Sequence, residues 1–115
     1  NPVSLMKLAK IDAYNVSLFS YFVEKLRSTP DGDGSLLDHS MIIYGAGMSD
    51  SNSHNPKDLP MLLVGGGSGQ LKGGRHIRYA KDTPVANLYV TLLDKLGVHT
   101  DNIGNSHGGL TDLSV

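Results

Sequence analysis

The order of apolar and polar residues predicts a long helix at the start of the chain. From Leu5 to Leu26 apolar side chains recur with a period close to 3.6, which gives one wide apolar stripe. Ser4 is a suitable N-cap, and a proline at position 30 disfavours helical backbone at Thr29. We therefore expect a helix over residues 4–27, followed by a turn over residues 31–34.

Two short apolar runs follow, at residues 40–45 and 60–64. Each is bounded by turn residues and has no polar alternation, a pattern typical of strands buried on both faces of a parallel sheet. Pro60 is acceptable because it stands at the first position of its strand. The polar segment between the runs is rich in Gly, Ser and Asn, and should be a loop at the carboxyl end of the first strand.

Glycine and a second helical pattern mark the rest of the chain. Residues 70–72 and 76–79 flank a glycine pair and could form a small two-stranded ribbon. Residues 84–96 have apolar positions at helical spacing, with Thr83 as a candidate cap, Pro84 at the first helical position and Gly97 at the end. Residues 98–115 read as a polar tail.

This order of elements predicts an α/β layer structure. Two short strands cannot form a complete parallel sheet, so more chain or a partner should complete it. The chain also opens with Asn1-Pro2 rather than Met, which suggests a mature or truncated product. We expect residues 1–115 to be a single domain or the C-terminal portion of a larger α/β domain.

Composition narrows the function classes. The chain has 115 residues, with 10 Lys+Arg against 11 Asp+Glu and a net charge of -1, so the overall basic charge of a nucleic-acid-binding domain is missing. No apolar run approaches the roughly 18 residues of a membrane span, and we expect no transmembrane segment. The absence of cysteine excludes disulfides, thiolate metal ligands and a cysteine nucleophile.

The loop over residues 45–55 carries the densest candidate chemistry. Asp50 and His54 offer the oxygen and nitrogen donors used in Zn, Mn or Ca sites. In α/β sheets, ligands bind outside the carboxyl ends of the strands, where this loop should lie. The alternative is an ordinary loop in which Asp and Asn side chains satisfy local backbone groups.

The glycine-rich run over residues 65–74 is a second candidate. Its backbone amides could cradle an anion, with Lys72 and Arg75 adding positive charge. Lys72 precedes Gly73, so the P-loop order of glycine, lysine and hydroxyl residue is not met. The alternative is a tight, exposed system of turns.

From about Leu26 to Leu113 the chain resembles a family of uncharacterised, mostly exported bacterial proteins named for an HXXSHH motif. The name-giving motif is not intact, because the nearest stretch, residues 50–55, keeps only the serine and one histidine. The resemblance lies in the segments Pro30–Asp38, Tyr44–Gly45, Met48–Asp50, His54–Asn55, Asp58–Pro60, Gly65–Gly67, Leu71–His76, Thr83–Pro84 and Leu92–Asp94.

The chain is also distantly similar to the C-terminal part of the alkaline phosphatase and sulfatase superfamily. The matching series is the strand at Met41–Tyr44, the metal-loop start Ser49-Asp50, Lys57 before a proline-led strand, and the helix at Val90–Gly97. This resemblance implies a three-layer α/β/α fold in which Asp50 is a metal ligand. Lys57 or His54 would then face the substrate anion or the metal.

The departures from that superfamily bear on activity. Ser51 stands where the superfamily has His or Asn, so one metal ligand is missing or is supplied by Asn52 or His54. The superfamily's nucleophile would lie upstream of this chain.

Two hypotheses follow from the resemblance. The first is the C-terminal part of a metal-dependent hydrolase of phosphate or sulfate esters, with a divalent metal (Zn, Mn or Ca) at Asp50, His54 and Asn52. In it Lys57, Lys72 and Arg75 would bind the anionic substrate. The second is a non-catalytic binding or assembly protein of the bacterial envelope that uses the same fold. Both imply contact with the upstream part of the same protein and a periplasmic or extracellular location.

Overall fold

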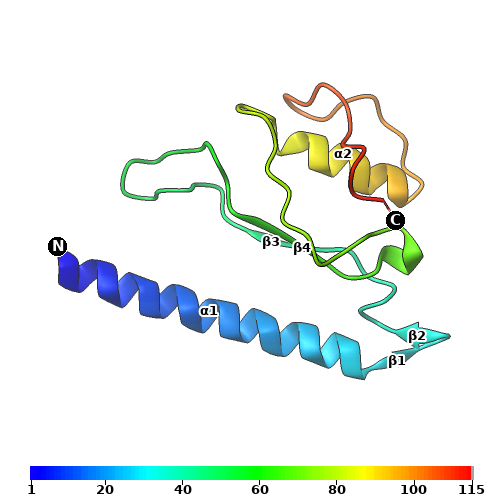
Figure 1. Ribbon diagram of the computed structural model, residues 1–115, viewed down its shortest axis with the longest axis horizontal. Coiled ribbons are helices and arrows are strands. Elements are labelled where there is room, and N and C mark those ends of the chain that lie inside the picture. The colour runs from blue at the N-terminus through cyan, green and yellow to red at the C-terminus, as the bar shows by residue number, and fades with distance from the viewer. Residues whose placement is uncertain (115) are drawn as a thin grey trace. The chain divides into compact units, whose positions relative to one another are not determined.

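The computed structural model describes residues 1–114, which divide after Leu37 into two compact units, residues 1–37 and 38–114 (Figure 1). Each unit contains one α-helix and one two-stranded antiparallel sheet. In chain order the elements are α1 (Pro2–Ser28), β1 (Pro30–Asp31), β2 (Gly34–Ser35), β3 (Ile42–Gly45), β4 (Met61–Val64), a 3₁₀ helix (Gly67–Gly69) and α2 (Ala86–Lys95).

Helix α1 confirms the first predicted helix, but it begins two residues earlier. Asn1 is the N-cap instead of Ser4, and its side-chain oxygen accepts a hydrogen bond from the Val3 amide at 3.0 Å. The helix ends at Thr29, whose backbone is extended (φ -97°, ψ 115°) because a proline follows. No residue of Pro2–Ser28 is buried, and side chains such as Leu5 remain 65% exposed.

The predicted turn over residues 31–34 is confirmed as the connection of a short hairpin. Pro30 pairs with Ser35 and Asp31 with Gly34. Gly32 adopts φ +60°, a conformation that glycine reaches without a steric penalty. The hairpin returns the chain to the end of α1, where the Leu37 amide donates to the Leu26 carbonyl at 3.3 Å.

Strands β3 and β4 confirm both predicted strands, but the expectation of a parallel pair is wrong. They are antiparallel, with Ile42 opposite Val64 and Gly45 opposite Met61. A parallel pair needs a crossover, usually a helix, and residues 46–60 contain none. Both faces of this two-stranded sheet are apolar, yet it is not buried throughout, because Leu62 is 51% exposed.

The glycine-rich run after β4 anchors that strand to the segment before β3. The amide of Gly67 donates to the Ser40 carbonyl at 3.0 Å, and the amide of Ser68 donates to the Asp38 carbonyl at 2.8 Å. Gly66 packs so closely on Asp38 that a Cβ there would lie 2.5 Å from the Asp38 carbonyl oxygen. The ribbon expected over residues 70–72 and 76–79 does not form, since these segments carry no strand.

Helix α2 confirms the second predicted helix and its glycine stop, but not its cap. The Thr83 hydroxyl donates to the Ala80 carbonyl at 2.7 Å, and the N-cap position falls on Val85 without a side-chain hydrogen bond. At the other end Gly97 has φ +83°. Its amide bonds the Asp94 carbonyl at 3.0 Å, and the Val98 amide bonds the Leu93 carbonyl at 2.9 Å, which is a Schellman closure.

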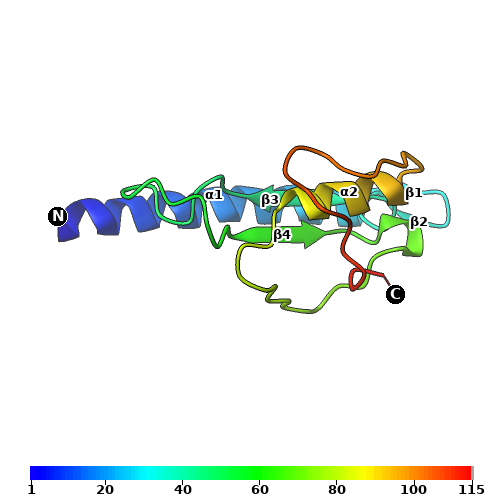
Figure 2. The ribbon, with the colours of Figure 1, turned by 90° about the horizontal axis from the view of Figure 1, so that it is seen from above.

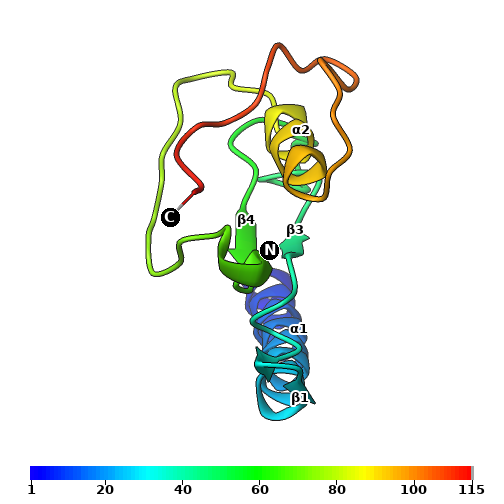
Figure 3. The same cartoon turned by 90° about the vertical axis from the view of Figure 1, so that its right-hand side faces the viewer.

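The C-terminal segment, expected to be a polar tail, folds back onto α2 instead (Figure 3). The Asn87 side chain accepts from the His107 amide at 3.1 Å, and the Thr91 hydroxyl accepts from the Leu110 amide at 2.6 Å. Leu113 is only 8% exposed. The small core therefore forms between α2 and the C-terminal segment. Its buried residues are Ala86, Val90, Leu92, Leu113, Asn87 and Thr91.

Candidate functional site

The loop that joins β3 to β4 carries the candidate metal ligands and projects beyond one end of the strand pair (Figure 1). Asp50 and Asn55 form an isolated antiparallel bridge. The Asn55 amide donates to the Asp50 carbonyl at 3.0 Å, and the Ser49 amide donates to the Asn55 carbonyl at 2.9 Å. This bridge closes residues 51–54 into one tight turn, so Asp50 and His54 stand at the two ends of the same turn.

The Asp50 carboxylate is held by its own turn. One oxygen (Oδ1) accepts from the Asn52 amide at 2.9 Å and from the Ser53 amide at 3.5 Å, and the other (Oδ2) accepts from the Ser53 hydroxyl at 2.8 Å. The Ser53 hydroxyl bond, followed by the two backbone bonds, lowers the pKa of Asp50 below its ordinary value. The carboxylate is therefore exposed, ionised at neutral pH and fixed in direction.

Two non-glycine residues of this loop have left-handed backbone conformations. His54 has φ 52° and Asp58 has φ 53°. Asp and His are among the residues that reach this region most readily, but it still costs backbone energy. For His54 this conformation places an exposed imidazole at the corner of the turn that begins with Asp50.

Lys57 lies just after that turn. Its amide donates to the Asn55 side chain at 3.0 Å, and its ammonium nitrogen lies 3.4 Å from the Asp82 carboxylate. Both side chains of this ion pair are largely exposed, and such pairs contribute little to stability. The Lys57 charge is therefore available near the candidate metal ligands, partly balanced by Asp82.

The other two candidate anion-binding residues lie elsewhere. Lys57 precedes β4, whereas Lys72 and Arg75 follow the 3₁₀ helix in the chain. That helix lies at the opposite end of the strand pair from the β3–β4 loop (Figure 2). The Arg75 side chain donates from Nε and Nη2 to the Lys72 carbonyl at 3.2 and 3.0 Å. The structure thus brings Lys72 and Arg75 together but does not bring them to Lys57.

In the middle of the glycine-rich run the backbone amides have little capacity to cradle an anion. Every backbone amide from Gly67 to Lys72 donates within the protein, the last of them to the Leu113 carbonyl at 3.2 Å. An anion there would have to displace these bonds. Residues 67–72 form tight turns, in which Gly67 and Gly69 adopt positive φ.

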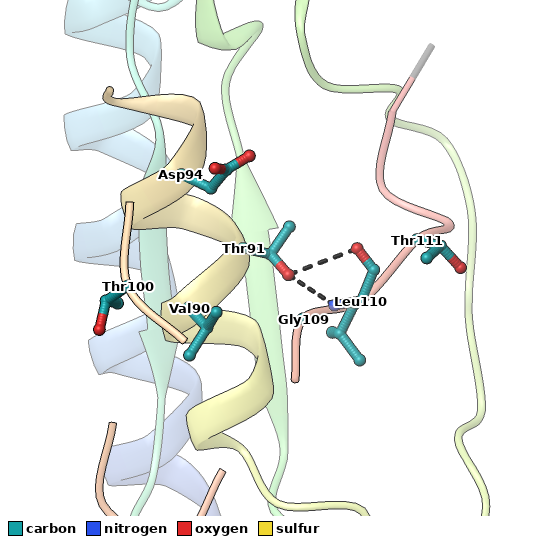
Figure 4. A pocket seen from close by; sticks show the side chains of 7 residues that line it. All are labelled: Val90, Thr91, Asp94, Thr100, Gly109, Leu110 and Thr111. Atoms are coloured by element: carbon teal, nitrogen blue, oxygen red, sulfur yellow. Dashed lines mark hydrogen bonds between the residues drawn. The ribbon is translucent and has the colours of Figure 1, made fainter. Parts of the chain in front are cut away.

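A cleft that the sequence did not indicate lies between α2 and the C-terminal segment (Figure 4). Its volume is about 250 Å³, and the Thr91 hydroxyl in its wall bonds both the amide and the carbonyl of Leu110. Asp94 at its edge bonds the His99 ring. Gly109 lies against this wall, because a Cβ there would be only 2.9 Å from the Thr91 hydroxyl.

Metal-ligating side chains are sparse in the part of the chain that the structure covers. Residues 1–114 contain no group of three or more His, Cys, Asp or Glu side chains that could hold a metal ion. Within the same residues no helix is long and apolar enough to cross a membrane.

Comparison of the chain with protein-family models, with curated proteins and with solved structures found no match in any of the three.

Proposed function

We propose that this chain is the C-terminal part of a metal-dependent hydrolase of phosphate or sulfate esters, with its nucleophile upstream. The observation that carries the proposal is the Asp50 carboxylate, which is ionised, exposed and fixed by three hydrogen bonds at the start of a turn that also presents His54. The order of motifs from Ser49-Asp50 to the final helix supports the same assignment through its similarity to the phosphatase and sulfatase superfamily.

The donor set fits a partial metal site. A carboxylate has about four lone-pair positions, and three hydrogen bonds to Asp50 leave room for a metal. His54 supplies an imidazole, and Asn52 supplies an amide oxygen. A protein-bound zinc ion usually has four ligands, so the remaining donors would come from outside residues 1–115.

In this proposal each residue of the loop has a separate task. The turn hydrogen bonds orient Asp50 and keep it deprotonated, as a metal ligand must be. Lys57 offers positive charge to the anionic ester, and Asn55 fixes the backbone of Lys57. A bound divalent metal would activate the upstream nucleophile and stabilise negative charge on the transferred group.

The sheet supports membership of a larger domain. Strands β3 and β4 pair only with each other, among residues 1–114, and both faces of the pair are apolar. Further strands and a further layer, as in a three-layer α/β/α fold, would cover these surfaces. The periplasmic or extracellular location remains part of the proposal and rests on the family resemblance.

A second candidate is a non-catalytic binding or assembly protein of the envelope. The observation that favours it is that Asp50 is fully accounted for as a turn residue, because its oxygens satisfy the amides of its own loop. Ser51, at the position where the superfamily has a metal ligand, points the same way.

Elemental analysis of the full-length protein separates the two candidates. We expect near-stoichiometric Zn, Mn or Ca in the wild type and its loss in the double variant Asp50→Ala, His54→Ala. The matched control is Asp94→Ala, His99→Ala, which removes one Asp and one His elsewhere in the chain, where the two side chains contact each other. A wild type that stays metal-free when supplied with these ions, or a metal lost only in the control, would refute the hydrolase.

A further inference from the structure

The segment from Lys72 to Lys81, called the basic loop below, concentrates positive charge. Four of the chain's 10 Lys+Arg lie within it, at every third position, and it contains no Asp or Glu. All four cationic residues, Lys72, Arg75, Arg78 and Lys81, are exposed. Since the chain as a whole has a net charge of -1, this local excess is a feature of one exposed segment and not of the overall composition.

The basic loop lacks regular secondary structure, yet hydrogen bonds hold it near both of its ends. At its start the Lys72 amide bonds the Leu113 carbonyl at 3.2 Å, and near its end the Tyr79 hydroxyl bonds the Asp112 carboxylate at 2.8 Å. Immediately after Tyr79, the Ala80 carbonyl accepts from the Thr83 hydroxyl at 2.7 Å. The C-terminal segment thus runs beside the loop and holds it (Figure 3). A binding segment ordered in advance loses less entropy on association.

The basic loop also leads to the proposed metal site. Asp82 follows Lys81 directly and pairs with Lys57 at 3.4 Å. Lys57 in turn is bonded to Asn55, which closes the turn that begins with Asp50. The Lys81 end of the row therefore leads through Asp82 to Lys57 on the loop of the candidate ligands, and the Lys72 end lies beside Leu113.

We propose that the basic loop binds a polysaccharide that carries several sulfate or phosphate esters, and that it guides this polymer to the Asp50 loop. The ester chemistry of this ligand rests on the proposed function. The row of four cations covers nine residue steps, which reach up to about 30 Å in extended chain, and a polymer with repeated ester groups can follow such a row. A nucleic acid fits less well, because the chain lacks overall basic charge and has no Trp for base stacking.

Binding of dextran sulfate to the full-length protein, measured by calorimetry over a series of salt concentrations, tests this inference. Neutral dextran is the uncharged comparison, and linear polyphosphate distinguishes phosphate from sulfate groups. For the double variant Arg78→Gln, Lys81→Gln we expect affinity for the anionic polymer to fall roughly tenfold, and the slope of log affinity against log salt to decrease by about two. The charge-matched control is Lys7→Gln, Lys10→Gln in α1, which should bind as the wild type does.

Three outcomes would each overturn the inference: the protein binds neither dextran sulfate nor polyphosphate; the α1 control variant weakens binding as much as Arg78→Gln, Lys81→Gln does; or single-stranded DNA binds as tightly as dextran sulfate. The titrations are made in a chelator and repeated with Asp50→Ala, His54→Ala, so that they do not depend on metal. If the polymer binds under these conditions and elemental analysis finds no metal in the wild type, the proposed hydrolase function is refuted and this inference is not. Metal binding without polymer binding would refute this inference alone.

Discussion

Replacing Thr91 with valine should loosen the C-terminal segment from α2. Thr91 is 9% exposed, and its hydroxyl oxygen accepts from the Leu110 amide at 2.6 Å while lying 3.1 Å from the Asn87 carbonyl. Valine has nearly the same volume and the same branching at Cβ, so it leaves the helix and the packing little changed. The substitution therefore isolates the hydroxyl that joins two segments nineteen residues apart.

The magnitude follows from the burial of the group left behind. A buried amide without a partner costs about 1–3 kcal/mol. Leu110 is only partly buried, so water can reach its amide in part, and we expect the lower half of that range, about 1–2 kcal/mol of unfolding free energy. Each kcal/mol corresponds to about 4–8 °C in melting temperature for a domain of 60–100 residues.

Urea unfolding of the wild type and of Thr91→Val measures this loss, and hydrogen exchange at the Leu110 and His107 amides locates it. The control is Thr100→Val, because the exposed Thr100 hydroxyl bonds only the nearby Asn102 carbonyl and its loss should cost under about 0.5 kcal/mol. Equal stability of Thr91→Val and wild type, with unchanged exchange at Leu110, would refute the assignment of this hydroxyl as the fastening point.

Two further predictions concern the glycine-rich run and the tyrosine of the basic loop. Gly66→Ala should destabilise the protein by about 1–3 kcal/mol in urea unfolding, because the new Cβ would lie 2.5 Å from the Asp38 carbonyl oxygen. The control Gly47→Ala has open space around it and should change the unfolding free energy by less than about 0.5 kcal/mol. Partial burial, then the hydrogen bond to Asp112, raise the pKa of Tyr79 to about 12. Because this folded pKa is above the ordinary 10.0, the contribution of Tyr79 to stability should be complete below about pH 10 and disappear as the pH rises through about 12. Absorbance titration of phenolate, with Tyr79→Phe to identify the signal, should show that Asp112→Asn lowers this pKa, and an unchanged titration would contradict the contact.

The parts of the fold that the sequence predicted well are those decided by local chemistry. Thr29 ends α1 because Pro30 restricts it, and Gly97 ends α2 because only glycine adopts φ +83° without strain. The predicted start of α2 was two residues too early, because the helix begins at Ala86 and not at Pro84, and the Thr83 hydroxyl bonds the preceding turn at the Ala80 carbonyl.

The parts that the sequence predicted poorly depend on distant contacts. Apolar residues on both faces of β3 and β4 are equally compatible with parallel and antiparallel pairing, so the pattern alone could not fix the direction. The return of the C-terminal segment depends on Asn87 and Thr91, two polar side chains one turn apart within an apolar helix. Their spacing is visible in the sequence, but their backbone partners about twenty residues away are not.

The same distinction applies to the candidate site. Asp50, His54 and Lys57 are neighbours in sequence and lie on one loop, as expected, whereas Lys72 and Arg75 are separated from them by β4. The hydrogen bonds to Asp50 explain it as a turn residue, yet they also keep it ionised and leave coordination positions free. Those bonds therefore do not decide between a turn and a metal ligand. The decision rests on the number of donors. Structural zinc sites have four protein ligands and catalytic sites have three, whereas the structure shows no group of three His, Cys, Asp or Glu side chains within residues 1–114. A metal that stays bound to the full-length protein and depends on Asp50 would therefore point to further donors from outside residues 1–115.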